Sequence, residues 1–171
     1  MESFKNSLRN KKKPITFLFL CSGNICRSPI AEMLFEKLAL ERNVRDQIIS
    51  TSGAVQFHND MICWEATQIL RKEGIDDGRI KDFFPRHISN YPELLKADVI
   101  LTMEDKHIRA IPKEYRTKAF LLSEFANESP INIIDPYGDS IEVYGEITKE
   151  IKYYLNKILD DLIEKGILSP N

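Results

Sequence analysis

The sequence has no long hydrophobic run and no strong excess of charge of either sign. No apolar stretch approaches the roughly 18 consecutive residues of a membrane-spanning helix, so we expect no membrane span. Residues 1–13 carry charges throughout and lack an apolar core, so we expect no signal peptide there. The net charge of −2 argues against a nucleic-acid-binding protein, which normally needs a strong basic excess.

Cysteine is scarce, with three residues in the chain. An odd number of cysteines without secretory features indicates a reducing compartment, so we expect a cytoplasmic protein whose thiols serve chemistry or packing. The sequence also lacks internal repeats, low-complexity tracts and a Pro/Gly/Ser-rich linker, and 171 residues suit one domain. We therefore expect a single domain over residues 14–171. A basic segment precedes it at residues 1–13, and the sequence leaves open whether that segment is ordered.

Short apolar runs alternate with segments of helical periodicity. Strands are predicted at 15–20, 47–52, 97–103 and 118–122, and helices from 29 onward and over 62–72 and 139–165. Ser28 is the predicted N-cap of the helix at Pro29, and Asp139 with Glu142 resembles a capping box. This order predicts an α/β three-layer sandwich around a central four-stranded parallel sheet. Because ligands bind beyond the carboxyl ends of such strands, the loop after the first strand is the best candidate site.

That loop, from Cys21 to Pro29, reads Cys-Ser-Gly-Asn-Ile-Cys-Arg-Ser-Pro. Gly23 and Asn24 tolerate left-handed backbone angles, so the loop can curl its N–H groups around an anion at a helix N-terminus. Arg27 adds a planar fork that can bind two phosphate oxygens. These positive partners favour the thiolate of Cys21, at the floor of the loop. The arrangement predicts a phosphoryl-transfer site with Cys21 as the nucleophile.

The same run resembles the phosphate loop of the low-molecular-weight protein tyrosine phosphatases, and the order of elements is similar from about residue 15 to the last helix. The resemblance implies a hydrolase that dephosphorylates protein tyrosine through a phosphocysteine intermediate, without a metal or a cofactor. It implies Cys21 as nucleophile and Arg27 as transition-state clamp. It also implies that Asn24 and Ser28 hold the loop and the thiolate, and that Ser52 supports the loop from the second strand.

A departing phenolate needs a proton, which a positioned carboxylic acid can supply. The run Ile-Asp-Pro-Tyr-Gly ending at Gly138 resembles the family's acid loop, which implies Asp135 as general acid and then as base toward water. Tyr137 and Phe57 are the candidate aromatic walls of the substrate cleft. The phosphate loop residues expected to bind the substrate are Ser22, Gly23, Asn24, Ile25, Cys26 and Ser28.

Ile25 bears on which phosphoester is cleaved. Related phosphatases acting on phosphoarginine carry threonine at this position, whereas a branched aliphatic side chain suits the phenyl ring of phosphotyrosine. The run Asp-Pro-Tyr-Gly-Asp-Ser from Asp135 is, however, similar to the acid loop of bacterial arginine phosphatases. We therefore predict phosphotyrosine-containing proteins as substrates, with phosphoarginine as the alternative. Phosphate and vanadate should act as competitive inhibitors.

Other interpretations concern the remaining cysteines. Cys26 either packs inertly or forms a reversible disulfide with Cys21 that protects the nucleophile. Cys21, Cys26, His58 and Cys63 have spacing acceptable for a zinc site, which would leave Arg27 unexplained. Arsenate reductases of this fold use two further downstream cysteines, and this chain has one.

The resemblance also has a gap near residues 83–88. A histidine that commonly joins the loop's hydrogen-bond network in the family falls on Phe83 here, whereas Arg86 fits the pattern.

Overall fold

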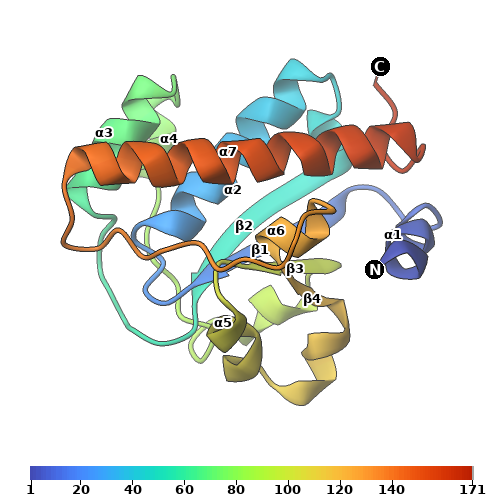
Figure 1. The fold of residues 1–171 in the computed structure, drawn as a ribbon, viewed down its shortest axis with the longest axis horizontal. Helices are drawn as coiled ribbons and strands as arrows, with labels where there is room; N and C mark the ends of the chain where they lie inside the picture. Colours follow the sequence, from blue (N-terminus) through green and yellow to red (C-terminus); the bar gives the residue numbers. More distant parts are fainter. Residues whose placement is uncertain (171) are drawn as a thin grey trace.

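A twisted parallel sheet lies in the middle of the molecule, with helices on both sides of it (Figure 1). The computed structural model describes residues 1–170. The strands are β1 (Ile15–Cys21), β2 (Ile48–Ala54), β3 (Val99–Thr102) and β4 (Ala119–Leu121). All pairs are parallel, in the order β2-β1-β3-β4. The four-stranded sheet and the three-layer α/β architecture expected from the sequence are confirmed.

Two hydrophobic cores lie on the two faces of the sheet. In β1, Phe17 and Phe19 belong to the larger core, whereas Leu18 and Leu20 belong to the smaller one. Because successive strand residues point to opposite faces, an uninterrupted apolar run fits a strand covered on both sides. On the larger core lie α1 (Glu2–Leu8), α2 (Arg27–Glu41), α3 (Trp64–Lys72), α6 (Leu122–Phe125) and α7 (Ile141–Glu164). On the smaller core lie η2 (Pro92–Lys96), α5 (Asp105–Ala110) and η3 (Lys113–Lys118).

The connection that matters for function leads from β1 into α2. The helix begins at Arg27 with Cys26 as its N-cap, so the prediction of Ser28 as the N-cap is wrong. The hydroxyl of Ser28 does not cap the helix, because it is engaged with the thiol of Cys21 and the amide of Asn24. Asn24 has a left-handed φ of 56°, as the sequence anticipated. The residues of the loop are therefore arranged around the thiol before the helix starts.

The start of α7 also differs from the prediction. Its N-cap is Ser140, and Asp139 instead ends a turn in which its N–H donates to the Pro136 carbonyl, so the predicted capping box is wrong. Gly138 has a φ of 86° at the third position of this turn, which glycine adopts without strain. The predicted helix end is confirmed, since Gly166 has a φ of 64° directly after the C-cap residue.

The N-terminal segment, whose order the sequence left open, contains α1. The ammonium of Lys5 is fully buried, 2.7 Å from Oδ2 of Asp161 and 2.9 Å from Oδ1 of Asn127. It also lies 4.7 Å from the centre of the Phe125 ring. Contacts with residues more than a hundred positions away hold this helix, so local sequence could not reveal it.

Short elements account for the other differences in boundaries. The strand predicted at 97–103 is shortened to β3, with Ala97 serving as the C-cap of η2. The strand predicted at 118–122 is shortened to β4 between η3 and α6. The structure adds η1 (Arg45–Gln47) and α4 (Asp77–Lys81), which the sequence did not reveal. Among the described residues, no helix has both the length and the apolar character needed to cross a membrane.

Candidate active site

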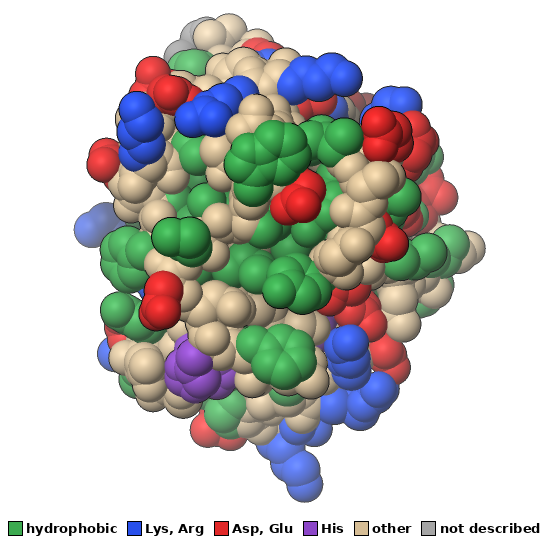
Figure 2. Space-filling view, turned by 90° about the vertical axis from the view of Figure 1, so that its left-hand side faces the viewer, with side chains coloured by type: hydrophobic (Ala, Val, Ile, Leu, Met, Phe, Trp, Pro, Cys, Tyr) green, Lys and Arg blue, Asp and Glu red, His purple; other side chains and the backbone are tan. Residues whose placement is uncertain are grey.

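A cavity of about 390 Å³ opens at the carboxyl end of β1, next to the N-terminus of α2. The residues that line it are Cys21, Ser22, Gly23, Ile25, Cys26, Arg27, Phe57, His58, Asn59, Asp135 and Tyr137. Figure 2 shows a hollow on one face of the molecule with exposed hydrophobic side chains gathered around it. The structure therefore brings together the predicted nucleophile, clamp, acid and aromatic residues, although they come from separate loops.

The thiol of Cys21 is buried at the floor of this cavity. Its sulfur lies 3.0 Å from Oγ of Ser28 and 3.3 Å from the backbone nitrogen of Asn24. The N-terminus of α2, fifteen residues long, follows directly, and the positive end of a helix dipole stabilises negative charge nearby. The Ser28 hydroxyl, a backbone N–H and the N-terminus of a helix thus converge on this sulfur.

Asn24 connects the phosphate loop to its surroundings. Its Nδ2 donates to Oγ of Ser28 and to Oγ of Ser52, both at 2.8 Å, while its Oδ1 accepts from the backbone nitrogen of Arg86 at 2.9 Å. Both the nitrogen and the oxygen of this buried amide are therefore hydrogen-bonded within the protein. Asn24, Ser28 and Ser52 are buried behind the cavity, and Asn24 and Ser28, which were expected to bind the substrate, are not among the residues that line it.

Glu32, which the sequence motifs did not indicate, extends this network. Its carboxylate accepts a hydrogen bond from Ser52 and pairs with the guanidinium of Arg79, which also binds Glu36 at 3.0 Å. Burial raises the pKa of Glu32, and the hydrogen bond from Ser52 and the charge of Arg79 oppose that rise. These contacts extend the network from the phosphate loop to Arg79 on α4. Glu32 lies in α2, the helix that directly follows the phosphate loop, and its side chain reaches Ser52 on β2. This position just after the loop is the feature of the sequence that could have indicated its role.

Arg27 lies at the centre of the polar contacts on the other side of the cavity. Its Nη1 donates to Oε1 of Glu104 and to the carbonyl of Ile133, both at 2.7 Å, and its Nη2 lies 3.0 Å from Oδ2 of Asp135. The side chain is buried, and its Nε has no hydrogen-bond partner. An orphaned, buried N–H on a positive group that lines a cavity is a binding site for an anion oxygen.

Glu104 was also missed, although it follows the third strand at the edge where sites are expected. Burial tends to raise the pKa of Glu104, but the hydrogen bond from Arg27 and the contact with Lys106 outweigh it, so the pKa lies below the usual range. The carboxylate is therefore ionised at neutral pH. It fixes the orientation of the guanidinium and partly balances its charge.

Ser22 of the phosphate loop is hydrogen-bonded to a buried histidine in α5, the helix that follows β3. Its Oγ lies 2.9 Å from Nε2 of His107, whose Nδ1 accepts from the backbone nitrogen of Glu104 at 3.1 Å. Burial and the charge of Arg27 lower the pKa of His107 to about 4. The ring is therefore neutral at pH 7, with its proton on Nε2, and it donates to Ser22.

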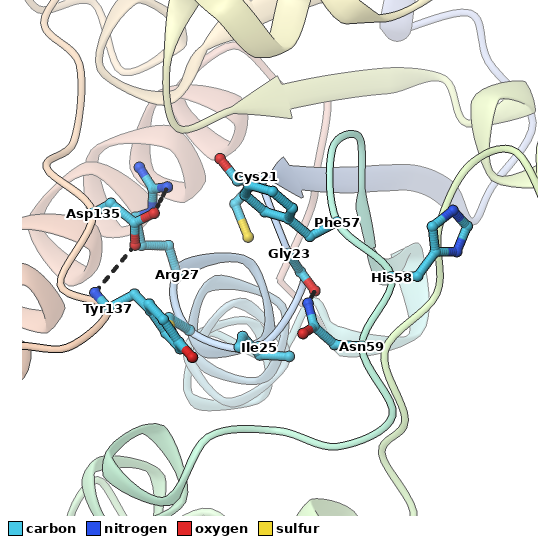
Figure 3. A pocket seen from close by; sticks show the side chains of 11 residues that line it. Cys21, Gly23, Ile25, Arg27, Phe57, His58, Asn59, Asp135 and Tyr137 are labelled. Carbon is cyan, nitrogen blue, oxygen red and sulfur yellow. Dashed lines mark hydrogen bonds and ion pairs between the residues drawn. The ribbon is translucent and has the colours of Figure 1, made fainter.

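Asp135 enters the cavity from the loop before α7. Its carboxylate meets Arg27 on one side, and its Oδ1 accepts from the backbone nitrogen of Tyr137 at 3.3 Å (Figure 3). The Asp135 side chain is 42% exposed, in contrast to the buried thiol of Cys21. A carboxylate that reaches both the anion site and solvent can exchange protons with a leaving group and with water.

The walls of the cavity are largely apolar. Phe57 and Tyr137 are exposed aromatic residues from different loops, and Ile25 lines the same cavity, between Tyr137 and Asn59 in Figure 3. Nδ2 of Asn59 donates to the carbonyl of Gly23 at 2.9 Å and ties the wall to the phosphate loop. A Cβ at Gly23 would lie 2.7 Å from that Nδ2, so a larger residue would displace Asn59. The cavity can hold a flat ring above the thiol.

Cys26, for which the sequence predicted either inert packing or a disulfide with Cys21, has a neighbour that the sequence did not suggest. Its sulfur lies 3.4 Å from the sulfur of Cys63 and 3.1 Å from the hydroxyl of Tyr144. All three cysteines are free thiols. The ring of His58 instead stacks on His87, with centroids 4.0 Å apart. Over residues 1–170 no three Cys, His, Asp or Glu side chains are grouped as metal ligands would be, so the four residues of the zinc interpretation do not form one site.

The comparisons with known proteins agree with this geometry. Residues 16–167 match the family model described as low molecular weight phosphotyrosine protein phosphatase. A protein-arginine-phosphatase of Bacillus subtilis (strain 168) is 30% identical over 151 residues, covering 85% of this chain and 95% of the relative. A low molecular weight phosphotyrosine protein phosphatase of Sus scrofa is 32% identical over 153 residues, covering 82% and 94%.

Solved structures resemble the chain over most of its length. The crystal structure of a low molecular weight protein tyrosine phosphatase from T. tengcongensis superposes with a TM-score of 0.75 at 31% identity, covering 86% of this chain and 99% of that one. The YwlE arginine phosphatase from Geobacillus stearothermophilus superposes with a TM-score of 0.78 at 26% identity, covering 90% and 96%. The likeness therefore extends to proteins named for two different substrates.

Proposed function

Because this chain belongs to the low molecular weight phosphotyrosine protein phosphatase family, whose members hydrolyse phosphate monoesters, we propose that it dephosphorylates phosphotyrosine on proteins through a phosphocysteine intermediate on Cys21. The observation that carries the proposal is the pairing of two groups on one cavity. The Cys21 thiol lies at the floor, and the buried guanidinium of Arg27 presents its unpartnered Nε. A phosphate bound by Arg27 and the loop amides has its phosphorus facing the sulfur.

In the first step the thiolate of Cys21 attacks phosphorus, and the bond from phosphorus to the phenolic oxygen breaks. Asp135 donates a proton to that oxygen, so the product leaves as a neutral phenol. The Nε and Nη2 groups of Arg27 share the negative charge on the phosphoryl oxygens, which supports a role in stabilising the transition state. A dianionic phosphate competes with Asp135 for Nη2, which releases the carboxyl group toward the leaving group.

In the second step water attacks the phosphocysteine. Asp135, now ionised, takes a proton from this water, the sulfur–phosphorus bond breaks, and inorganic phosphate leaves with the thiolate of Cys21 restored. The hydroxyl of Ser28, 3.0 Å from the sulfur, stabilises the thiolate as a leaving group. The step balances without a metal or a cofactor.

The walls of the cavity support phosphotyrosine as the substrate. Ile25, Phe57 and Tyr137 offer apolar contacts to a phenyl ring. Phosphoarginine is the second candidate, because relatives at 26–30% identity carry the name arginine phosphatase. For a thiol nucleophile to persist, the protein must work in a reducing compartment, so we infer that it acts in the cytoplasm.

The test is a side-by-side assay of kcat/KM on phosphotyrosine and phosphoarginine peptides, with Cys21→Ser as the control. We expect faster turnover of phosphotyrosine, competitive inhibition by vanadate and phosphate, and no effect of chelators. Cys21→Ser should abolish turnover and still bind vanadate, because serine is a much weaker nucleophile but keeps the loop. Turnover that persists in Cys21→Ser would contradict a phosphocysteine intermediate on Cys21.

A second pair of variants isolates substrate choice. Ile25→Thr should raise activity on phosphoarginine relative to phosphotyrosine, because it adds a hydroxyl, while Ile25→Val keeps a branched apolar side chain and serves as the matched control. If the ratio of activity on phosphoarginine to activity on phosphotyrosine is the same in both variants, Ile25 does not determine the choice of substrate. If the unmodified protein turns over phosphoarginine faster than phosphotyrosine, phosphoarginine is its substrate.

A further inference from the structure

A second pair of thiols lies at the side of the phosphate loop and has no part in the proposed reaction. The sulfurs of Cys26 and Cys63 are 3.4 Å apart. Cys26 is the N-cap residue of α2 and Cys63 is the N-cap residue of α3, so neither sulfur lies on a mobile end of a long side chain. The backbone N–H of Cys63 donates to the carbonyl of Ile25 at 3.1 Å, which fixes the two segments relative to each other.

A tyrosine hydroxyl completes the cluster. Tyr144, in the first turn of α7, places its OH 3.1 Å from the sulfur of Cys26 and 3.5 Å from that of Cys63. Tyr144 and Cys26 are buried, whereas Cys63 is half-buried. Cys26 also lines the cavity, so small solutes can reach the pair from the cavity or past Cys63.

We propose that Cys26 and Cys63 are an oxidation site for hydroperoxides, which join them in a reversible disulfide and leave Cys21 as a free thiol. A disulfide bond is about 2.05 Å long, so the sulfurs need to approach by little more than an ångström. The sulfur of Cys21, by contrast, is held by Ser28 and by the backbone of Asn24. The pairing differs from the Cys21–Cys26 disulfide expected from the sequence.

The two thiols are unequal, which assigns their roles. Its hydrogen bond with Cys26 and, to a smaller extent, its hydrogen bond with Tyr144 lower the pKa of Cys63 to about 7, against the opposing effect of burial. The same hydrogen bond, together with burial, raises the pKa of Cys26. Cys63 is therefore the thiolate that reacts first, and Cys26 is the thiol that resolves the product.

The chemistry balances with one hydroperoxide. The Cys63 thiolate attacks the terminal oxygen, the O–O bond breaks, and the leaving oxygen departs as water or an alcohol after taking a proton, which gives Cys63 sulfenic acid. The sulfur of Cys26 then attacks the sulfenic sulfur. The S–O bond breaks, hydroxide leaves and takes up the Cys26 proton as water. The two thiols have lost two electrons and the hydroperoxide has gained them, and an external dithiol reverses the result.

Tryptic peptides of the full chain distinguish the possible disulfides. Cleavage after Lys12, Arg27, Arg45 and Arg71 places Cys21 and Cys26 together on peptide 13–27, because the bond before Pro14 resists trypsin, and Cys63 on peptide 46–71. A Cys26–Cys63 disulfide joins two peptides, whereas a Cys21–Cys26 disulfide is a loop within one. We would treat the protein with hydrogen peroxide, block free thiols with an alkylating agent at low pH, and digest without a reductant.

We expect the joined peptides, with one alkylated cysteine on 13–27, and their complete loss after treatment with dithiothreitol. Cys21→Ser should give the same joined peptides, because Cys21 is not a partner. Cys63→Ser should lose them. An unjoined peptide 13–27 with an internal disulfide in the unmodified protein would overturn the proposal, as would loss of the joined peptides in Cys21→Ser. These readouts do not depend on turnover, so they stand apart from the proposed phosphatase activity.

Tyr144→Phe supplies a further measurement. It removes the hydroxyl and keeps the ring that packs in the core, so the protein should fold. The Cys63 thiolate loses one hydrogen bond, and we expect the joined peptides to form several-fold more slowly at pH 7, with the rate profile shifted to higher pH. Tyr153→Phe, on the exposed side of the same helix, is the matched control. An unchanged profile in Tyr144→Phe would contradict the assignment of Cys63 as the reacting thiolate.

Discussion

Two loops face the cavity, and they differ in how firmly the protein holds them. In the phosphate loop Asn24 and Ser28 are fully buried, and their side chains bond to each other, to β2 and to the Cys21 thiol. In the acid loop Ile134 and Tyr137 are each 69% exposed. The acid loop is anchored at one end, where Ile133 lies within hydrogen-bond distance of Arg27 and of Met103.

This difference matches what the two steps of the reaction demand. A nucleophile gains from being fixed at one distance from phosphorus, because misplacement by an ångström is costly in rate. A group that must first donate a proton and then accept one gains from limited freedom. The ion pair between Asp135 and Arg27 joins the two loops, and because the Asp135 side chain is 42% exposed, a bound phosphate can replace it as the partner of Arg27.

Arg27 contacts both loops, so its substitution should have the largest effect. Arg27→Lys keeps the charge and removes Nε and the planar fork, and we expect kcat/KM on p-nitrophenyl phosphate to fall by roughly 10³-fold. Vanadate should bind more weakly as well. Arg109→Lys, an exposed residue paired with Asp105, is the control and should leave the rate unchanged. A loss of less than tenfold in Arg27→Lys would mean that charge alone suffices at this position.

The acid loop can be tested through its leaving-group dependence. Asp135→Asn keeps the shape of the side chain and removes the proton donor, so we expect kcat to fall by about 10²-fold for the least acidic phenols. The loss should shrink for p-nitrophenyl phosphate, whose phenolate leaves without help. Asp139→Asn, four residues further along the same loop, is the matched control. An equal loss across a series of aryl phosphates would show that Asp135 is not the acid.

The support of the phosphate loop can be tested at Ser52, a buried residue of β2. Ser52→Ala removes the hydroxyl that joins Asn24 to Glu32, and we expect a fall of about tenfold in kcat/KM together with a loss of about 1–3 kcal/mol in unfolding free energy. Ser50→Ala is the matched control, because Ser50 is also buried on β2 but donates to the backbone carbonyl of Glu32.

The two serine variants should lose similar stability, yet a slower turnover should appear in Ser52→Ala alone. Equal rates in both variants would make the network beneath the loop purely structural.

The contrast between the two loops also marks what the sequence could reveal. The spacing of Cys21 and Arg27, between an apolar strand and a helix, predicted the floor of the site because those residues are neighbours in the chain. The environment of Cys26 could not be predicted, because Cys63 and Tyr144 reach it from helices 37 and 118 residues away. Short elements such as α5 and α6 were missed for a related reason, since a helix of one or two turns has too few residues for a periodic pattern.

A pH-dependent effect on stability is expected at His107, whose ring connects Ser22 of the phosphate loop to the backbone of Glu104 after β3. An unfolded histidine takes up a proton below a pH of about 6.5, whereas burial and Arg27 lower the pKa of His107 in the folded protein to about 4. The unfolded state therefore binds more protons between these values, and the free energy of unfolding falls as the pH drops from about 6.5 toward 4.

The slope in this window is about 1.4 kcal/mol per pH unit from this one residue. His107→Gln cannot ionise, so its urea midpoint should decline less between pH 6.5 and pH 4.5 than that of the unmodified protein. At pH 7 the variant should be less stable, because the bond to Ser22 is weakened or lost, and at pH 4.5 the gap should close. Parallel curves for the two proteins would mean that His107 takes up its proton equally in the folded and the unfolded state, so that its pKa is not lowered by folding.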